Sequence, residues 1–190
     1  TLTRLMTERG LATLRFDFFG QGQSPDQFEN LTLTIALSQA STVLDWATAQ
    51  GFTRVGLIGS SFGGLVAVLT AAQRPTVTCL GLKCPVGDFP EELRLEFGEA
   101  EMATWKATDT VRHIHGGTGR VPLKFALYED CLGYDAYEAA ERITAPTVIV
   151  QGGKDEYVPA HQSRRVFQAL AGRKRFDLLP HANHQFTQAD

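Results

Sequence analysis

The chain has 190 residues, of which 43% are hydrophobic and 21% are charged, a composition typical of a globular domain with one sizeable core. Its 18 basic and 21 acidic residues leave a net charge of −3 without a basic stripe, which argues against a nucleic-acid partner. The longest apolar runs are too short to span a bilayer, so we expect no membrane partner.

Strands and helices are predicted to alternate along most of the chain. Short runs of strand-forming residues lie between stretches that carry apolar residues at helical spacing. Gly51 follows the first long helix as a C-cap, and Pro159 stands at the start of the last one. The strands are almost continuously apolar, which favours a mostly parallel sheet and an α/β fold. The predicted strands span 11–18, 54–59, 77–84, 146–152 and 173–180, and the predicted helices span 32–50, 62–74 and 160–170.

One region breaks this alternation. Residues 88–140 contain acidic helical patches, Trp105, the glycine-rich turn HGGTGR and the aromatic cluster ALYEDCLGYDAYEAA. A single crossover helix would be enough to join the strands on either side. We therefore interpret 88–140 as a cap inserted into one α/β core, which is formed by 1–87 and 141–190.

The cysteines and histidines bear on compartment and metal content. Three cysteines, an odd number, argue against a disulfide framework, and we expect Cys79 and Cys84 to be buried reduced thiols. No secretory signal is visible, so these features indicate a reducing, cytoplasmic-type compartment. The histidines show no paired ligand spacing and no Cys/His cluster is present, so neither a metal nor a cofactor is expected.

The stretch LIGSSFGGLV joins a predicted strand directly to a predicted helix. GSSFG at 59–63 matches the pattern G-x-S-x-G, in which a sharp turn presents the central serine at the top of a sheet. The register selects Ser61, because Ser60 would need a glycine where Ile58 stands. Both glycines are expected to prevent clashes in the turn, and the N–H of Phe62 is a natural oxyanion donor. The alternative is a turn that uses small residues only for close packing.

A serine hydroxyl is a weak nucleophile that needs a base, and the base needs an acid to orient it. Asp155 in GGKDEYVP and His184 in LPHANHQF each follow a predicted strand, at the edge where chemistry gathers in an open α/β sheet. The order serine, acid, histidine is the order expected after a nucleophile elbow. We therefore predict a triad of Ser61, His184 and Asp155. The alternatives are Glu156 or Asp88 as the acid and His181 as the histidine.

Four motifs resemble the α/β-hydrolase superfamily and together cover nearly the whole chain. RFDFFGQGQS resembles the family's strand and its Asp-Phe-x-Gly-x-Gly-x-Ser turn, GSSFGG its elbow, QGGKDEYVP its acid loop and LPHANHQF its histidine loop. Within the superfamily the chain is similar to cap-bearing cinnamoyl and feruloyl esterases and to the serine aminopeptidase-like group. The resemblance implies an α/β-hydrolase fold with Ser61 as nucleophile, Asp155 as acid and His184 as base.

The chain departs from the family pattern at its start. In this family a strand and a histidine-glycine loop precede the region aligned to Thr1, and that loop supplies the second oxyanion N–H. The resemblance places the strand between those predicted at 11–18 and 54–59, so its absence leaves backbone groups unpaired. We therefore expect N-terminal strands of the fold to be missing here. HIHGG at 113–117 is similar to the loop but falls in the predicted cap.

The predicted reaction is a two-step acyl transfer. His184 takes the proton of Ser61 as it attacks, the Phe62 N–H stabilises the oxyanion, and water activated by His184 releases the acid. The expected partner is a small-molecule ester with a short or aromatic acyl group, and a homodimer is left open. A peptidase, thioesterase or lactonase fits the same triad, and a non-catalytic binding module fits the same fold. The cap residues weighed for specificity are Leu93, Leu95, Phe97, Met102 and Trp105 as an apolar lining or as packing, and Asp130, Tyr134 and Tyr137 as polar contacts.

Overall fold

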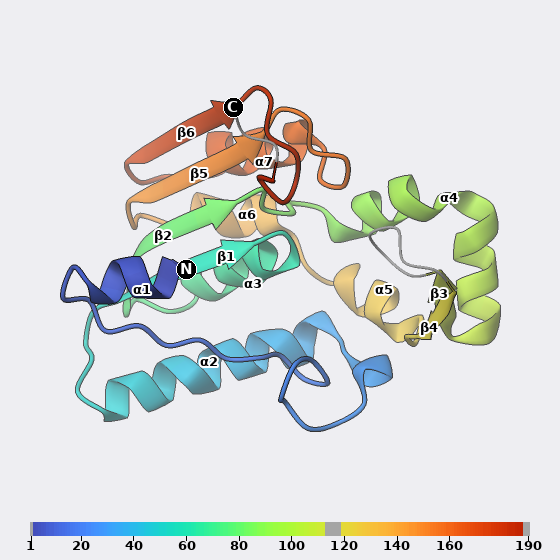
Figure 1. The fold of residues 1–190 in the computed structure, drawn as a ribbon, viewed down its shortest axis with the longest axis horizontal. Coiled ribbons are helices and arrows are strands. Elements are labelled where there is room, and N and C mark those ends of the chain that lie inside the picture. Colours follow the sequence, from blue (N-terminus) through green and yellow to red (C-terminus); the bar gives the residue numbers. More distant parts are fainter. Residues whose placement is uncertain (1, 113–118, 188–190) are drawn as a thin grey trace.

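Four parallel strands form the sheet at the centre of the computed structural model, which describes residues 2–112 and 119–187 (Figure 1). Their spatial order is β1-β2-β5-β6, so the carboxyl ends of all four lie at the same edge. The predicted α/β class and four of the five predicted strands are confirmed. The strands are β1 (Val55–Ser60), β2 (Val77–Lys83), β5 (Thr147–Gly152) and β6 (Lys174–Leu179).

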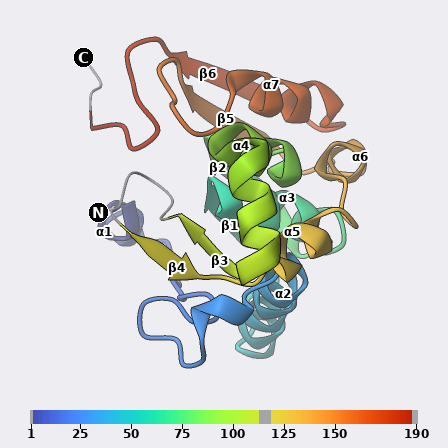
Figure 2. The same ribbon diagram turned by 90° about the vertical axis from the view of Figure 1, so that its right-hand side faces the viewer.

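Helices connect the strands and pack on the sheet (Figures 1 and 2). α3 (Phe62–Ala71) packs on β1 and β2, and α7 (Ala160–Ala169) packs on β5 and β6. α6 (Ala136–Glu141) contacts α3 and α7, and α2 (Leu33–Ala49) packs against α3. The three predicted helices are therefore confirmed with slightly shorter bounds. Gly51, at φ 89°, follows the end of α2 in the left-handed conformation that suits a glycine after a helix.

A second group of elements lies beyond the carboxyl ends of the strands, to the right of the sheet in Figure 1. It consists of α4 (Phe89–Thr108), β3 (Thr110–Arg112), β4 (Arg120–Pro122) and α5 (Ala126–Cys131), and β3 pairs with β4 in an antiparallel ladder. Gly98, at φ 70°, has a non-helical backbone conformation and kinks α4. The Trp105 indole N–H donates to the carbonyl of Leu123 at 2.6 Å, which ties α4 to the strand pair.

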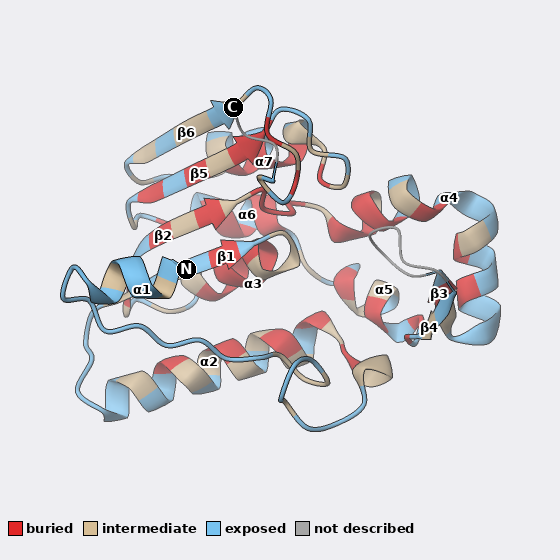
Figure 3. Cartoon of the chain, viewed as in Figure 1, coloured by how far each residue is buried: buried red, intermediate tan, exposed pale blue. Residues whose placement is uncertain are grey.

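The buried residues form one continuous core that runs from the sheet into this second group (Figure 3). Leu80, Leu82 and Ile149 supply its centre in the sheet, and Trp105 supplies its largest fully buried side chain in α4. The chain therefore folds around one apolar core, as its length predicts.

The strand predicted at 11–18 is wrong. These residues form no regular element, and their large apolar side chains Leu11, Leu14 and Phe16 are exposed. Within the described residues β1 pairs with β2 alone, and Ile58 at the middle of β1 is 58% exposed. A strand is stable only when its backbone N–H and C=O groups meet a neighbouring strand, so strand-forming composition does not suffice here. Helix α1 (Leu2–Thr7) precedes this segment and the short 3₁₀ helix η1 (Phe28–Asn30) follows it.

Two further observations concern the surface. Cys79, expected to be buried, is exposed on β2, whereas Cys84 and Cys131 are buried and all three are free thiols. A search of the described residues finds no helix that is both long and apolar enough to span a bilayer.

Candidate active site

Ser61 occupies the turn between β1 and α3, and its backbone conformation is unusual. Its φ of 54° and ψ of −125° lie where residues other than glycine are strained. The turn is held by the Ser61 N–H, which donates to the Lys83 carbonyl at 3.0 Å, and by the Ser61 carbonyl, which accepts the Gly64 N–H at 2.8 Å. Phe62 is the first residue of α3, so its N–H has no acceptor within the helix and lies beside the serine. This is the geometry of a nucleophile elbow.

The two glycines of the turn have different roles. A Cβ at Gly59 would lie 2.3 Å from the carbonyl oxygen of Gly63, so only glycine fits at that position. A Cβ at Gly63 would meet nothing within 4 Å, contrary to the expectation that both glycines prevent a clash. The second close approach is instead at Gly64, where a Cβ would lie 2.8 Å from the Cβ of Pro85.

Asp155 and His184 come together at the same edge of the sheet. The Nδ1 of His184 lies 2.9 and 2.8 Å from the two carboxylate oxygens of Asp155, and both side chains are at most 2% exposed. Oδ1 of Asp155 also accepts the backbone N–H groups of Tyr157 and Val158, at 3.0 and 2.9 Å. Oδ2 accepts from Nε2 of Gln151 at 3.1 Å. The carboxylate is thus fixed by donors that leave it one orientation.

These donors determine the charge of the pair. Burial alone raises the pKa of Asp155, but hydrogen bonds from His184, Cys84 and the Val158 and Tyr157 N–H groups outweigh it and lower that pKa to about 2. Asp155 is therefore an anion at neutral pH and accepts a hydrogen bond from the Nδ1–H of His184. Nε2 is then the ring nitrogen able to act as a base.

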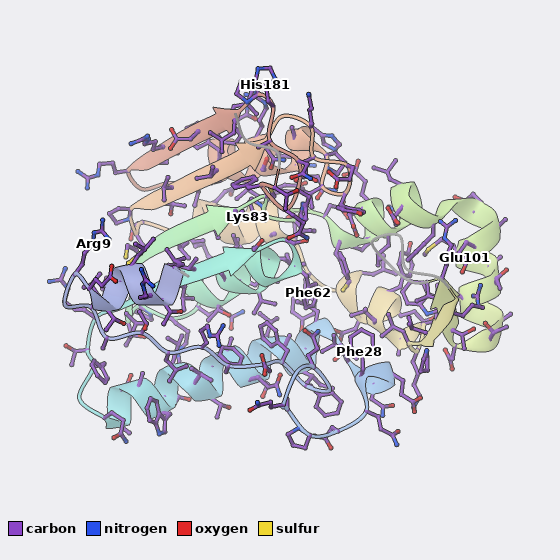
Figure 4. The ribbon with its side chains drawn as sticks, in the orientation of Figure 1. Arg9, Phe28, Phe62, Lys83, Glu101 and His181 are labelled. Carbon is purple, nitrogen blue, oxygen red and sulfur yellow. The ribbon has the colours of Figure 1, made fainter. Side chains whose placement is uncertain are left out.

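The alternative acids and the alternative histidine lie in other environments than the Asp155–His184 pair. The Asp88 carboxylate caps α4 by accepting the Glu91 N–H at 2.8 Å, and His181 is exposed (Figure 4). Glu156 accepts the backbone N–H of His184 at 3.1 Å, while the ring of that histidine faces Asp155. The hydrogen bonds described within 2–112 and 119–187 do not include one from the Ser61 hydroxyl to the His184 ring. Such contacts often tighten only when substrate binds.

Cys84 completes the buried cluster beside the acid. Its Sγ, an oxygen of Asp155 and a nitrogen of His184 all lie within 4.8 Å of one another, which is a spacing that also suits a metal ion. Burial, followed by the hydrogen bond to Asp155, raises the pKa of the Cys84 thiol to about 12, so it keeps its proton at neutral pH. The protonated thiol donates to the carboxylate and so helps to hold Asp155 beside His184.

The residues weighed for specificity are mostly engaged in packing. Leu93, Phe97, Met102 and Trp105 belong to the buried core, whereas Leu95 is 62% exposed. Asp130 accepts both the N–H and the hydroxyl of Thr34, at 2.8 and 2.6 Å, and the Tyr134 hydroxyl also contacts that hydroxyl at 2.6 Å. These contacts tie α5 to α2. Tyr137 lines a mainly polar cavity of about 260 Å³ with Tyr134, Arg94 and Arg165. HIHGG at 113–117 lies outside the described residues.

Lys83 is a site residue that the sequence analysis missed. It ends β2, and its Nζ donates to the carbonyl oxygen of His184 at 2.6 Å and to the Ser60 hydroxyl at 3.3 Å. The one signal available in the sequence was a charged residue at the end of an apolar strand, at the functional edge of the sheet. Figure 4 labels Lys83 at the end of β2 and Phe62 at the start of α3.

Comparisons with known proteins agree on the fold. A family model described as "Alpha/beta hydrolase family" matches residues 1–190. The structure of Est1E from Butyrivibrio proteoclasticus with ferulic acid bound superposes with a TM-score of 0.83 at 26% identity, covering 98% of this chain and 74% of that one. A Paleococcus ferrophilus monoacylglycerol lipase gives 0.70 at 20% identity, covering 96% and 79%.

Two relatives found by sequence are uncharacterized bacterial proteins. An uncharacterized 31.7 kDa protein of Escherichia coli is 26% identical over 199 residues, which span 87% of this chain and 70% of that protein. An uncharacterized protein of Mycobacterium tuberculosis is 28% identical over 178 residues, which span 92% of this chain and 53% of that protein.

Proposed function

Because the chain belongs to the alpha/beta hydrolase family, we propose that it is a serine hydrolase that cleaves carboxylic esters with Ser61, His184 and Asp155. The observation that carries this proposal is the buried His184–Asp155 pair, joined at 2.8 and 2.9 Å, at the sheet edge where the strained Ser61 turn ends β1. An ionised acid, an oriented histidine and a serine presented by a sharp turn are the parts that nucleophilic acyl transfer needs.

The proposed mechanism gives each of these groups a role. Nε2 of His184 removes the proton of the Ser61 hydroxyl while Oγ attacks the ester carbonyl. Asp155 holds the ring through Nδ1 and stabilises the imidazolium that forms, since its lowered pKa keeps it ionised. The Phe62 N–H, at the positive end of α3, stabilises the oxyanion. The imidazolium protonates the leaving alcohol, and His184 then activates water that releases the acid from Ser61.

The substrate class is proposed from position and from similarity. The α4–α5 region lies beyond the carboxyl ends of the strands, and we propose that it acts as a cap that selects a small or aromatic acyl group. The ferulic acid bound to the similar protein Est1E supports an aromatic acyl substrate. Three free cysteines agree with a reducing, cytoplasm-like compartment.

Ester hydrolysis tests the proposal. The protein is assayed with p-nitrophenyl esters of increasing acyl length and with methyl ferulate. We expect turnover to favour the short and aromatic esters and to fall at least about 10⁴-fold in Ser61→Ala. Ser38→Ala, at an exposed position on α2, is the matched control and keeps the parent rate. Turnover that survives in Ser61→Ala would contradict the assignment, and binding of these esters without turnover would favour a binding module.

A further inference from the structure

We propose that Lys83 is a positioning residue that fixes the distance between the serine turn and the histidine loop, and this inference rests on the proposed function. The lysine joins two segments that are far apart in the sequence: the elbow at 60–62 and the loop at 180–187. In this role Lys83 fixes the distance between the side chains of Ser61 and His184 and does not itself contact the substrate.

The first contact is with the backbone of the histidine. The Lys83 ammonium donates to the His184 carbonyl oxygen at 2.6 Å, and His184 itself is buried. On the other side of the same residue, the Glu156 carboxylate accepts the His184 N–H at 3.1 Å. Groups of opposite charge thus hold the two peptide groups that flank the catalytic ring, and hydrogen bonds to charged groups are stronger than neutral ones.

The second contact is with the serine turn. The main-chain carbonyl of Lys83 accepts the Ser61 N–H at 3.0 Å, and its side chain donates to the Ser60 hydroxyl at 3.3 Å. Lys83 therefore bonds both to the serine turn and to the histidine loop. Ser60, which the G-x-S-x-G pattern does not use, takes part in this connection as a hydrogen-bond acceptor. The strand register places Lys83 directly beside Ser60 in the sheet.

The loop that carries His184 needs such support. It contains no regular element after β6, and Phe186 within it has a φ of 57°, which is strained for a bulky side chain. The Lys83 ammonium lies 4.8 Å from the centre of the Phe186 ring and so stabilises this conformation by a cation–π contact. Without Lys83, the carbonyl of His184 loses its charged partner and the ring gains freedom relative to Ser61.

The test compares the rate at which a fluorophosphonate labels Ser61 in the parent chain and in variants. A misplacement of about 1 Å can slow a reaction by about 10²-fold, so we expect Lys83→Met to label about 10- to 100-fold more slowly. Lys83→Arg keeps a charged donor and restores the rate to within about 5-fold. Lys174→Met is the matched control: Lys174 also donates to main-chain carbonyls and lies over an aromatic ring, that of Phe167 at 5.2 Å, but it stands at the start of β6, at the other edge of the sheet from Ser61.

A second readout follows the histidine itself and does not depend on catalysis. The ring Nδ1–H of His184, bonded to Asp155, is observed by NMR in histidine-labelled protein. We expect this resonance to shift or broaden in Lys83→Met and to be unchanged in Lys174→Met. If Lys83→Met does not fold, as judged by thermal unfolding, Lys83→Gln takes its place because it keeps an N–H donor without the charge.

The outcomes separate the two proposals. Parent protein that shows the Nδ1–H resonance but no adduct on Ser61 contradicts the hydrolase assignment, while the shift in Lys83→Met still supports the positioning role. Equal labelling rates and equal spectra for the parent and Lys83→Met overturn the positioning role. So does an equal loss of rate in Lys83→Met and Lys83→Arg, because it would show that the charged donor is not what matters.

Discussion

Two irregular parts of the chain, the segment at 11–18 and the pair of loops at 153–158 and 180–187, differ in how their backbone groups are satisfied. The first loop bonds to the end of β6 and to the second loop: the Gly153 N–H donates to the Leu179 carbonyl at 2.8 Å, and the Lys154 N–H donates to the Ala182 carbonyl at 2.9 Å. The two loops also carry the buried Asp155–His184 pair. The segment at 11–18 has the composition of a strand, but its residues 11–17 are exposed. Hydrogen-bond partners, rather than local composition, therefore determine which irregular segment is ordered enough to hold a pair of functional side chains.

The largest expected effect on activity comes from removing the charge of Asp155, whose bond to His184 joins the two ordered loops. Asp155→Asn keeps the size of the side chain but removes the charge that holds the tautomer and stabilises the imidazolium, so we expect ester turnover to fall about 10⁴-fold. Steady-state kinetics with a short p-nitrophenyl ester measures this. Asp177→Asn, in a surface pair with Arg175, is the control and keeps the parent rate. A loss below about 10-fold in Asp155→Asn would contradict the role of the acid.

A leucine in the sheet and a leucine at 11–18 should differ in their effect on stability. Leu80 is 2% exposed at the centre of β2, so Leu80→Ala should lower the free energy of unfolding by about 2–5 kcal/mol. Leu14 is 49% exposed, so Leu14→Ala should change it by less than about 0.5 kcal/mol. Urea unfolding of both variants measures the contrast. Similar losses in the two would show that 11–18 packs more closely than the structure indicates.

Glu92, in the ordered helix α4, allows a further test, because its side chain is buried although one oxygen of its carboxyl group lacks a hydrogen bond among the described residues. Its Oε2 has no hydrogen-bond partner among the described residues, and burial, with the nearby charges of Glu96 and Asp155, raises its pKa to about 8. The native state therefore keeps a proton that the unfolded chain loses above the ordinary pKa of 4.5. The free energy of unfolding should therefore fall as the pH rises from 4.5 to about 8. Glu92 contributes about 1.4 kcal/mol to this fall for each pH unit.

The substitution Glu92→Gln removes that ionisation. We expect its free energy of unfolding to be flatter than that of the parent between pH 5 and pH 8, as measured by urea unfolding at several pH values. Glu99→Gln, at an exposed position on the same helix, should leave the parent's pH dependence unchanged. The same slope in the parent and in Glu92→Gln would show that another group causes it.

The sequence predicts the parts of the site that depend on chain order. Ser61, Asp155 and His184 each follow a strand, and parallel strands bring their carboxyl ends to one edge, so the order of loops suffices to place them. The roles of Lys83 and Glu156 were missed, because both act on the His184 backbone through contacts across the fold. The strand at 11–18 was wrong because pairing depends on a neighbour, which composition does not encode.

The measurement that tests the account most directly is the identification of the residue that a fluorophosphonate modifies. Intact mass spectrometry before and after treatment, followed by peptide mapping, should give a single adduct on Ser61 that is absent from Ser61→Ala and retained in Ser38→Ala. An adduct on Ser60 or elsewhere, or no adduct on the folded protein, would contradict the assignment of Ser61, His184 and Asp155 as the reactive triad.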